Sequence, residues 1–174
     1  PVTLPYREAE APLGIHSKFR HSDEEASAGY YRVLLKDYNI NVELTATERC
    51  GIQRYTFPKA QSAVFLNLKK AMNWDFTQDS HIEVVDSCTI QGYRFSDGWA
   101  RGQRVFFRTR FSKPFRSSEI DTTAIIQDGK TIGTAYVARF NFDTTDGEEI
   151  VLCTALSGVS MEGAAGNLAA EAPH

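Results

Sequence analysis

The sequence predicts an all-β fold: an antiparallel β-sandwich with a short C-terminal linker helix. Apolar and polar residues alternate with a period of two along several segments, as in strands that bury one face. Asp-Gly pairs, which favour tight hairpin turns, separate some of these segments. Helical spacing of apolar residues appears late, near the C-terminus. About nine short strands, packed as two sheets, are the simplest arrangement.

The alternating segments indicate antiparallel strands with one buried face. In chain order they are Tyr31, Val33 and Leu35; Ile40, Val42, Leu44 and Ala46; Val64, Leu66 and Leu68; and Val105, Phe107, Thr109 and Phe111. Asp128-Gly129 separates Ile125–Gln127 from Thr131-Ile132, and Asp146-Gly147 marks a later turn. Asp-Gly readily adopts the positive φ angles of a two-residue hairpin turn, so both sites predict hairpins.

A helix is predicted after Ser160, whose hydroxyl can cap the first turn. Met161, Ala164, Ala165 and Leu168 follow at helical spacing, and Pro173 ends the segment. Two interior glycines each destabilise this helix by about 1 kcal/mol relative to alanine, so it needs a surface to pack on. The chain therefore divides into an N-terminal arm (1–18), a β-sandwich domain (19–158) and a linker helix (159–174).

Composition narrows the class of protein. With 174 residues, of which 42% are hydrophobic and 24% charged, the chain has the makeup of one globular domain. A net charge of −3 gives no general attraction to nucleic acid, and no apolar run reaches the roughly 18 residues needed for membrane insertion. Arg104, Arg108 and Arg110 leave one alternative, a basic groove for an anionic polymer.

Cys50, Cys88 and Cys153 lack the close spacing of a zinc site. Three thiols allow at most one internal disulfide, and buried, unreactive thiols are the favoured interpretation. The sequence does not decide whether a disulfide forms.

A resemblance to a known family rests mainly on the segment Ile90–Phe115. Its motifs are Gly92-Tyr93-Arg94, Gly98-Trp99-Ala100, Gln103 and Phe111-Ser112-Lys113-Pro114-Phe115. Further blocks run from Phe19-Arg20-His21 to Asn167-Leu168. Together they resemble the amino-terminal domain of glycoside hydrolase family 92, the calcium-dependent exo-acting alpha-mannosidases.

The resemblance implies a supersandwich that supports a separate helical catalytic domain and helps to recognise terminal mannose in glycans. The family's opening Asn-Pro-Phe-Ile-Gly segment is not found between Pro1 and Gly14, so we expect the front of the domain to be truncated. We expect the acid and base of inverting hydrolysis, and the calcium ligands, in the catalytic domain, which makes this chain inactive alone. The resemblance also implies a bacterial, periplasmic or secreted enzyme of N-glycan degradation.

Trp99 and Gln103 are the candidate substrate-binding residues. An indole beside a turn can stack on a sugar ring, and an amide four residues later can bind hydroxyl groups. Trp99 can instead pack beneath its loop, and Gln103 can instead bond to backbone. Tyr93 and Arg94 carry the same two interpretations.

We expect no metal ligand in this chain. His21, Asp23, Glu24 and Glu25 supply oxygen ligands of the kind that calcium prefers, but an acidic run before a strand is more often solvated. Asp143, Asp146 and Glu148 lack the spacing of a calcium loop and fit a hairpin turn.

Two further functions stay open at this stage. The chain can be a stand-alone module that binds mannose-containing glycan, or a purely structural interaction module. An enzyme domain is expected to expose an apolar docking face for its catalytic domain and to self-associate through it. Linkage specificity and oligomeric state do not follow from the sequence.

Overall fold

The computed structural model describes residues 17–70 and 75–172 of the chain. Its strands are β1 (Glu24–Ser27), β2 (Tyr30–Leu35), β3 (Ile40–Ala46), β4 (Cys50–Phe57), β5 (Ala60–Asn67), β6 (Phe76–Asp86), β7 (Thr89–Asp97), β8 (Gln103–Phe111), β9 (Ser117–Gln127), β10 (Lys130–Thr144) and β11 (Glu148–Ser157). A 3-10 turn at His21–Asp23 precedes β1, and helix α1 spans Met161–Glu171.

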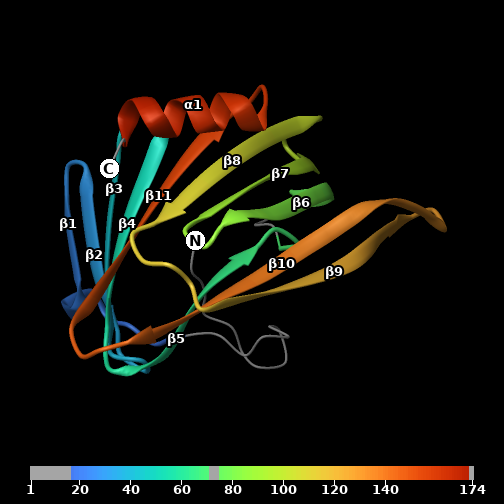
Figure 1. Ribbon diagram of the computed structural model, residues 1–174. Helices are drawn as coiled ribbons and strands as arrows, with labels where there is room; N and C mark the ends of the chain where they lie inside the picture. Colours follow the sequence, from blue (N-terminus) through green and yellow to red (C-terminus); the bar gives the residue numbers. More distant parts are fainter. Residues whose placement is uncertain (1–16, 71–74, 173–174) are drawn as a thin grey trace.

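The strands form two antiparallel sheets packed face to face (Figure 1). The larger sheet has the order β1-β2-β3-β4-β11-β8-β7-β6, and the smaller one has the order β5-β10-β9. Helix α1 lies across β8 and β11 on the face of the larger sheet that points away from the smaller sheet. We call this helix-covered side the outer face of the larger sheet. The predicted β-sandwich with a C-terminal helix is confirmed.

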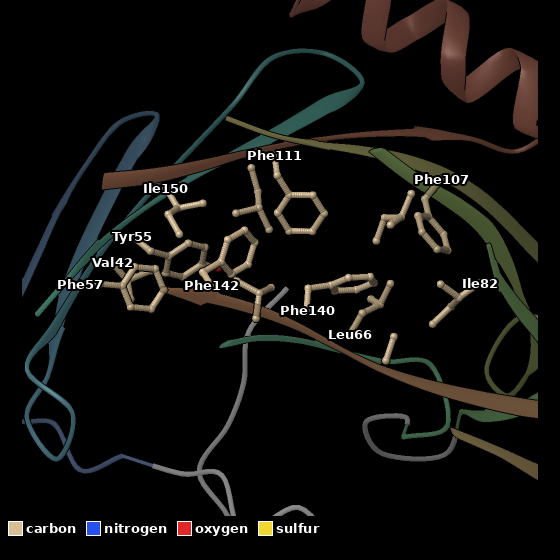
Figure 2. Packing of buried hydrophobic residues seen from close by; sticks show 14 of the residues in the cluster. Val42, Tyr55, Phe57, Leu66, Ile82, Phe107, Phe111, Phe140, Phe142 and Ile150 are labelled. Carbon is tan, nitrogen blue, oxygen red and sulfur yellow. The ribbon is translucent and has the colours of Figure 1, made fainter. Parts of the chain in front are cut away.

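The core lies between the inner faces of the two sheets. Phe140 and Phe142 of β10 are almost fully buried and point towards Phe111 of β8 (Figure 2). Their ring centroids lie 5.4 Å and 5.8 Å from that of Phe111. Phe115, at the end of the Phe-Ser-Lys-Pro-Phe motif, adds a fourth ring 5.2 Å from Phe140. This motif therefore closes the core between β8 and β9.

The turns follow the predicted chemistry. Asp128 and Gly129 have φ angles of 50° and 74°, as the two central residues of a type I′ turn require. The hairpin between β9 and β10 therefore begins where the sequence places it. Gly147, with a φ of 72°, makes the turn before β11.

The helix begins at the predicted cap, because Gly163 N donates to Ser160 Oγ at 3.0 Å. Ala164 and Leu168 are buried against the outer face of the sheet, where they meet Cys50 and Ala155. This contact supplies the packing surface that a helix with two glycines needs.

The described residues form eleven strands, where the sequence predicted about nine. The short edge strand β1 and most of β9 are exposed on both faces, so neither buries the alternating side chains that a sequence pattern detects. Residues 1–16 of the predicted arm lie outside the described residues. The helix falls inside the predicted segment 159–174.

Candidate functional site

The candidate site is the hairpin tip between β7 and β8, residues 98–102, which carries Trp99. The two strands pair in register up to Ser96 and Gln103, so the tip starts directly from a regular ladder. Gly102 adopts a φ of 63°, and Gly98 N donates to Ala100 O at 3.2 Å. A glycine with positive φ lets the chain reverse without steric strain.

Asp97 holds the tip in place through both oxygens of its carboxylate. The amide of Gly102 donates to Oδ1, and the side-chain amide of Gln78 donates to Oδ2. The first bond closes the loop, and the second ties it to β6. Bonds to a charged acceptor are stronger than neutral ones, so the hairpin tip is anchored on two sides.

Trp99 projects from this anchored tip with 89% of its surface exposed. The alternative that it packs beneath its own loop is therefore wrong. Large apolar side chains usually bury most of their area, so such an exposed indole is the kind of feature that marks a binding surface. Its role towards a sugar stays a prediction.

Gln103 lies at the base of the same tip and is only partly exposed. Its side-chain amide donates to Ala100 O at 3.4 Å, a long hydrogen bond within the loop. The structure thus contains the loop-fixing bond of the alternative interpretation. The carbonyl oxygen and the second N–H of this amide are left to meet a ligand.

Tyr93 and Arg94 serve the framework below the tip. The Tyr93 hydroxyl donates a hydrogen bond to Asp79 at 3.0 Å. Burial is the main reason that the pKa of the Tyr93 phenol is raised, and this hydrogen bond raises it further. Arg94 Nε donates to Thr77 Oγ1 at 3.0 Å, and its Nη2 lies 2.8 Å from a carboxylate oxygen of Asp75. Arg94 therefore ties the start of β6 to β7, directly below the Trp99 hairpin.

A groove of about 830 Å³ opens at the same end of the larger sheet. It is lined by the turn between β3 and β4, the start of β8, the end of β11 and one side of α1. Val105, Leu156 and Val159 give it an apolar lining, and 84% of Val159 is exposed. Arg49 and Arg104 stand at its border. Sequence reasoning missed this groove, although an apolar Val159 between Gly158 and Ser160 was a signal.

The three arginines of β8 do not form an open basic groove. The Arg104 guanidinium lies 5.2 Å from the centre of the Phe95 ring, and Arg108 Nη1 donates to Gln91 at 2.9 Å. Arg110 donates to the backbone oxygen of Ala172 at the end of α1. Each guanidinium has a partner on the outer face, which leaves little for an anionic polymer.

Each acidic cluster of the sequence has a carboxylate that is engaged in an ion pair with a lysine. Asp23 lies 2.7 Å from Lys36 Nζ, and this hydrogen bond lowers the pKa of the carboxyl group. Glu148 lies 2.6 Å from Lys113 Nζ, which lowers its pKa to about 2. Within residues 17–70 and 75–172, no three His, Cys, Asp or Glu side chains come together as a metal site would need.

The carboxyl groups whose pKa the structure shifts have the opposite shift from the one that a general acid needs. A proton donor in glycoside hydrolysis needs a raised pKa. Hydrogen bonds instead lower the pKa of five carboxyl groups, those of Asp23, Glu43, Glu148, Glu162 and Glu171.

All three cysteines are free thiols, and burial raises the pKa of Cys50. None of the helices described is long and apolar enough to span a membrane.

Comparison with known proteins identifies the domain. The model of the glycosyl hydrolase family 92 N-terminal domain matches residues 2–157. This chain belongs to that family. Residues 2–157 are therefore an N-terminal domain of glycosyl hydrolase family 92, as the resemblance implied.

Solved structures of family GH92 mannosidases have the same fold as this chain. A family GH92 alpha-mannosidase from Bacteroides thetaiotaomicron, in complex with mannoimidazole, matches with a TM-score of 0.81 and 29% identity. The match covers 95% of this chain and 23% of the mannosidase. A GH92 inverting mannosidase from the same organism shares the fold, with a TM-score of 0.72 and 23% identity over 90% of this chain and 21% of that one.

The chain thus spans about a quarter of the length of the structures that it matches. A search of curated proteins found no match.

Proposed function

We propose that this family 92 domain is the non-catalytic N-terminal part of an exo-acting alpha-mannosidase. In this proposal it supports a catalytic domain and presents Trp99 to the terminal mannose of a glycan. The observation that carries the proposal is the exposed indole on a hairpin tip that Asp97 anchors, in a domain with the fold of a mannosidase solved with mannoimidazole. A fixed aromatic surface orders a sugar ring at little entropic cost.

Gln103 has the secondary role in this proposal. Its side-chain carbonyl can accept a hydrogen bond from a sugar hydroxyl while the amide bonds to Ala100. The groove beside the hairpin is the proposed contact for the catalytic domain, because Val105, Leu156 and Val159 are more exposed than large apolar residues usually are. Exposed apolar side chains also support self-association as a proposal.

The chemistry of hydrolysis is assigned to the catalytic domain. Calcium, which the family resemblance implies, does not fit the described residues here, since one carboxylate of each acidic cluster is paired with a lysine and no three possible ligands come together among these residues. We therefore place its ligands outside this domain. A bacterial origin, a periplasmic or secreted location and a role in N-glycan degradation belong to the same proposal.

The test is Trp99→Ala in the full-length polypeptide, assayed with an alpha-linked mannobiose. We expect kcat/KM to fall about tenfold or more, which corresponds to about 1.4 kcal/mol of lost transition-state binding. Arg101→Ala, at another exposed position of the same tip, is the matched control. Hydrolysis at the wild-type rate by the Trp99 variant would rule out a role for the indole.

A stand-alone carbohydrate-binding module is the second candidate, favoured by the same exposed indole. Calorimetric titration of the 174-residue chain with a mannose-rich oligosaccharide separates the two. Saturable binding that Trp99→Ala abolishes favours the stand-alone module. No binding by the chain, together with activity of the full-length protein, favours the enzyme domain.

A further inference from the structure

Helix α1 ends with a charge of the sign that its own dipole disfavours. Its last residue is Glu171, and its last turn carries no basic residue. The carboxyl end of a helix has a partial negative charge, so a carboxylate at that end weakens the helix. Only 15% of the Glu171 side chain is exposed. A charge that is unfavourable locally and shielded from solvent indicates a role in contacts outside the helix.

The contacts of Glu171 lie on the turn between β3 and β4, far from it in the sequence. The hydroxyl of Thr47 and the backbone amide of Arg49 both donate to Oε2, the amide at 2.8 Å. Arg49 Nη1 donates to Oε1 at 2.9 Å. Both carboxylate oxygens are engaged, and hydrogen bonds to a charged acceptor are stronger than neutral ones. We call these three bonds the Glu171 clamp.

The clamp completes a series of contacts along α1. Near the start of the helix, Gly163 approaches β11 so closely that a Cβ on it would lie 2.6 Å from Ser157 Oγ. In the middle, Asn167 Nδ2 donates to the backbone oxygen of Leu156 at 2.8 Å. The first two contacts fix α1 to the end of β11. The clamp alone among these three joins the helix to the β3–β4 turn.

The clamped turn forms one wall of the groove of about 830 Å³. Residues 47–51 line the groove on this side, and Arg104 and Val105 of β8 line it on the other, with residues 156–159 of the β11 end also in the lining. The sheet order places β11 between β4 and β8. Arg104 and Val105 follow directly after the hairpin that carries Trp99. The position of the turn therefore sets the shape of the groove beside that hairpin.

We propose that Glu171 is a positioning residue, which fixes the groove in the shape that receives the catalytic domain and so holds Trp99 in place over the substrate. This inference rests on the proposed function, in which the groove contacts that domain and the indole meets the terminal mannose. Glu171 acts on the placement of one domain against the other and has no contact with the sugar. A misplacement of about 1 Å far from the reacting atoms can lower a rate severely.

Amide hydrogen exchange of the 174-residue chain tests the clamp without reference to hydrolysis. Glu171→Ala removes all three bonds, and alanine is the best helix former, so the substitution does not weaken the helix itself. The Arg49 amide, which loses its acceptor, should exchange about tenfold faster or more. Circular dichroism verifies that the variant is folded.

Glu48→Ala is the matched control on the same turn. The Glu48 carboxylate accepts from Arg49 Nη2 at 3.0 Å and is not the acceptor of the Arg49 amide. This variant loses the same charge and should leave the exchange of that amide unchanged. Exchange of the Arg49 amide at the wild-type rate in Glu171→Ala would overturn the clamp.

A double-mutant cycle in the full-length polypeptide tests the positioning role. With an alpha-linked mannobiose, Glu171→Ala should lower kcat/KM about fivefold when Trp99 is present, and less than about twofold in a Trp99→Ala background, because the clamp acts through the indole. A loss of equal size in both backgrounds would mean a merely structural role and overturn the proposal. Full activity of Trp99→Ala alone would overturn the proposed function and the positioning role together, whereas the exchange experiment would still decide whether the clamp exists.

Discussion

Asp97→Ala should loosen the hairpin that carries Trp99. The substitution removes both hydrogen bonds of the carboxylate, one from the Gly102 amide and one from Gln78. The tip then loses its closure and its tie to β6 at once. The Trp99 side chain itself is unchanged.

The size of the effect follows from the two bonds. A hydrogen bond to a charged group contributes about 1.5–3 kcal/mol when buried, and partial exposure of Asp97 places each bond at or below the low end of that range. We expect the free energy of unfolding to fall by about 2 kcal/mol. For a domain of this size the melting temperature then drops by about 4–8 °C.

Chemical denaturation measures the stability, and amide hydrogen exchange reports on the hairpin. The Gly102 amide should exchange much faster in the variant, because its acceptor is gone. Gln78→Ala removes only one of the two bonds and should cost about half as much. Unchanged Gly102 exchange, or a stability loss below about 0.5 kcal/mol, would refute the argument that Asp97 anchors the tip.

Three further substitutions test the framework. In the folded protein the pKa of Glu148 is about 2, below its ordinary value of 4.5. The ion pair of Glu148 with Lys113 therefore stabilises the fold fully above pH 4.5, and this stabilisation is lost as the pH falls towards 2. Lys113→Gln should therefore lower the denaturation midpoint at pH 6 and reduce the loss between pH 6 and pH 3; an unchanged pH dependence would contradict the pairing. Phe140→Ala should cost about 3–5 kcal/mol in thermal unfolding, as for other fully buried rings, and a smaller loss would mean that the core collapses onto the gap. Gly92→Ala should disrupt the pairing of β6 and β7, because the new Cβ would overlap the backbone oxygen of His81 in β6. Gly51→Ala is the control, because its new Cβ meets nothing within 4 Å and should leave stability nearly unchanged. Equal melting temperatures of the two variants would contradict this argument.

The sequence predicted the parts of the fold in which one face of a strand is buried. Val42, Phe107 and Phe111 alternate with polar residues because they point into the core, and this periodicity is visible without a structure. The turn at Asp128-Gly129 and the cap at Ser160 were also predictable, because both depend on local chemistry.

Features that depend on contacts across the sheets were not predictable. β9 buries almost nothing and carries no periodicity, so its length was missed. The anchoring of Asp97 by Gln78 joins residues nineteen positions apart on neighbouring strands. The groove at Val159 exists only because the end of β11, the start of β8 and α1 meet there.

The sequence predicted a turn beside Trp99, but the details of this candidate site needed the structure. The motif around Trp99 placed the residue at a turn, and the structure adds that the indole is exposed and its loop anchored. The partner of Gln103 within the loop could not be read from spacing, because it depends on the path of the backbone at Ala100.

The mass of the native polypeptide tests the central claim most directly. An immunoblot of source cells, with antibodies raised against this chain, measures it. The solved mannosidase that matches 95% of the chain is covered over only 23% of its own length, so we predict a band at roughly four times 19.5 kDa. A single band near 19.5 kDa would contradict the assignment to a larger mannosidase and favour a stand-alone module.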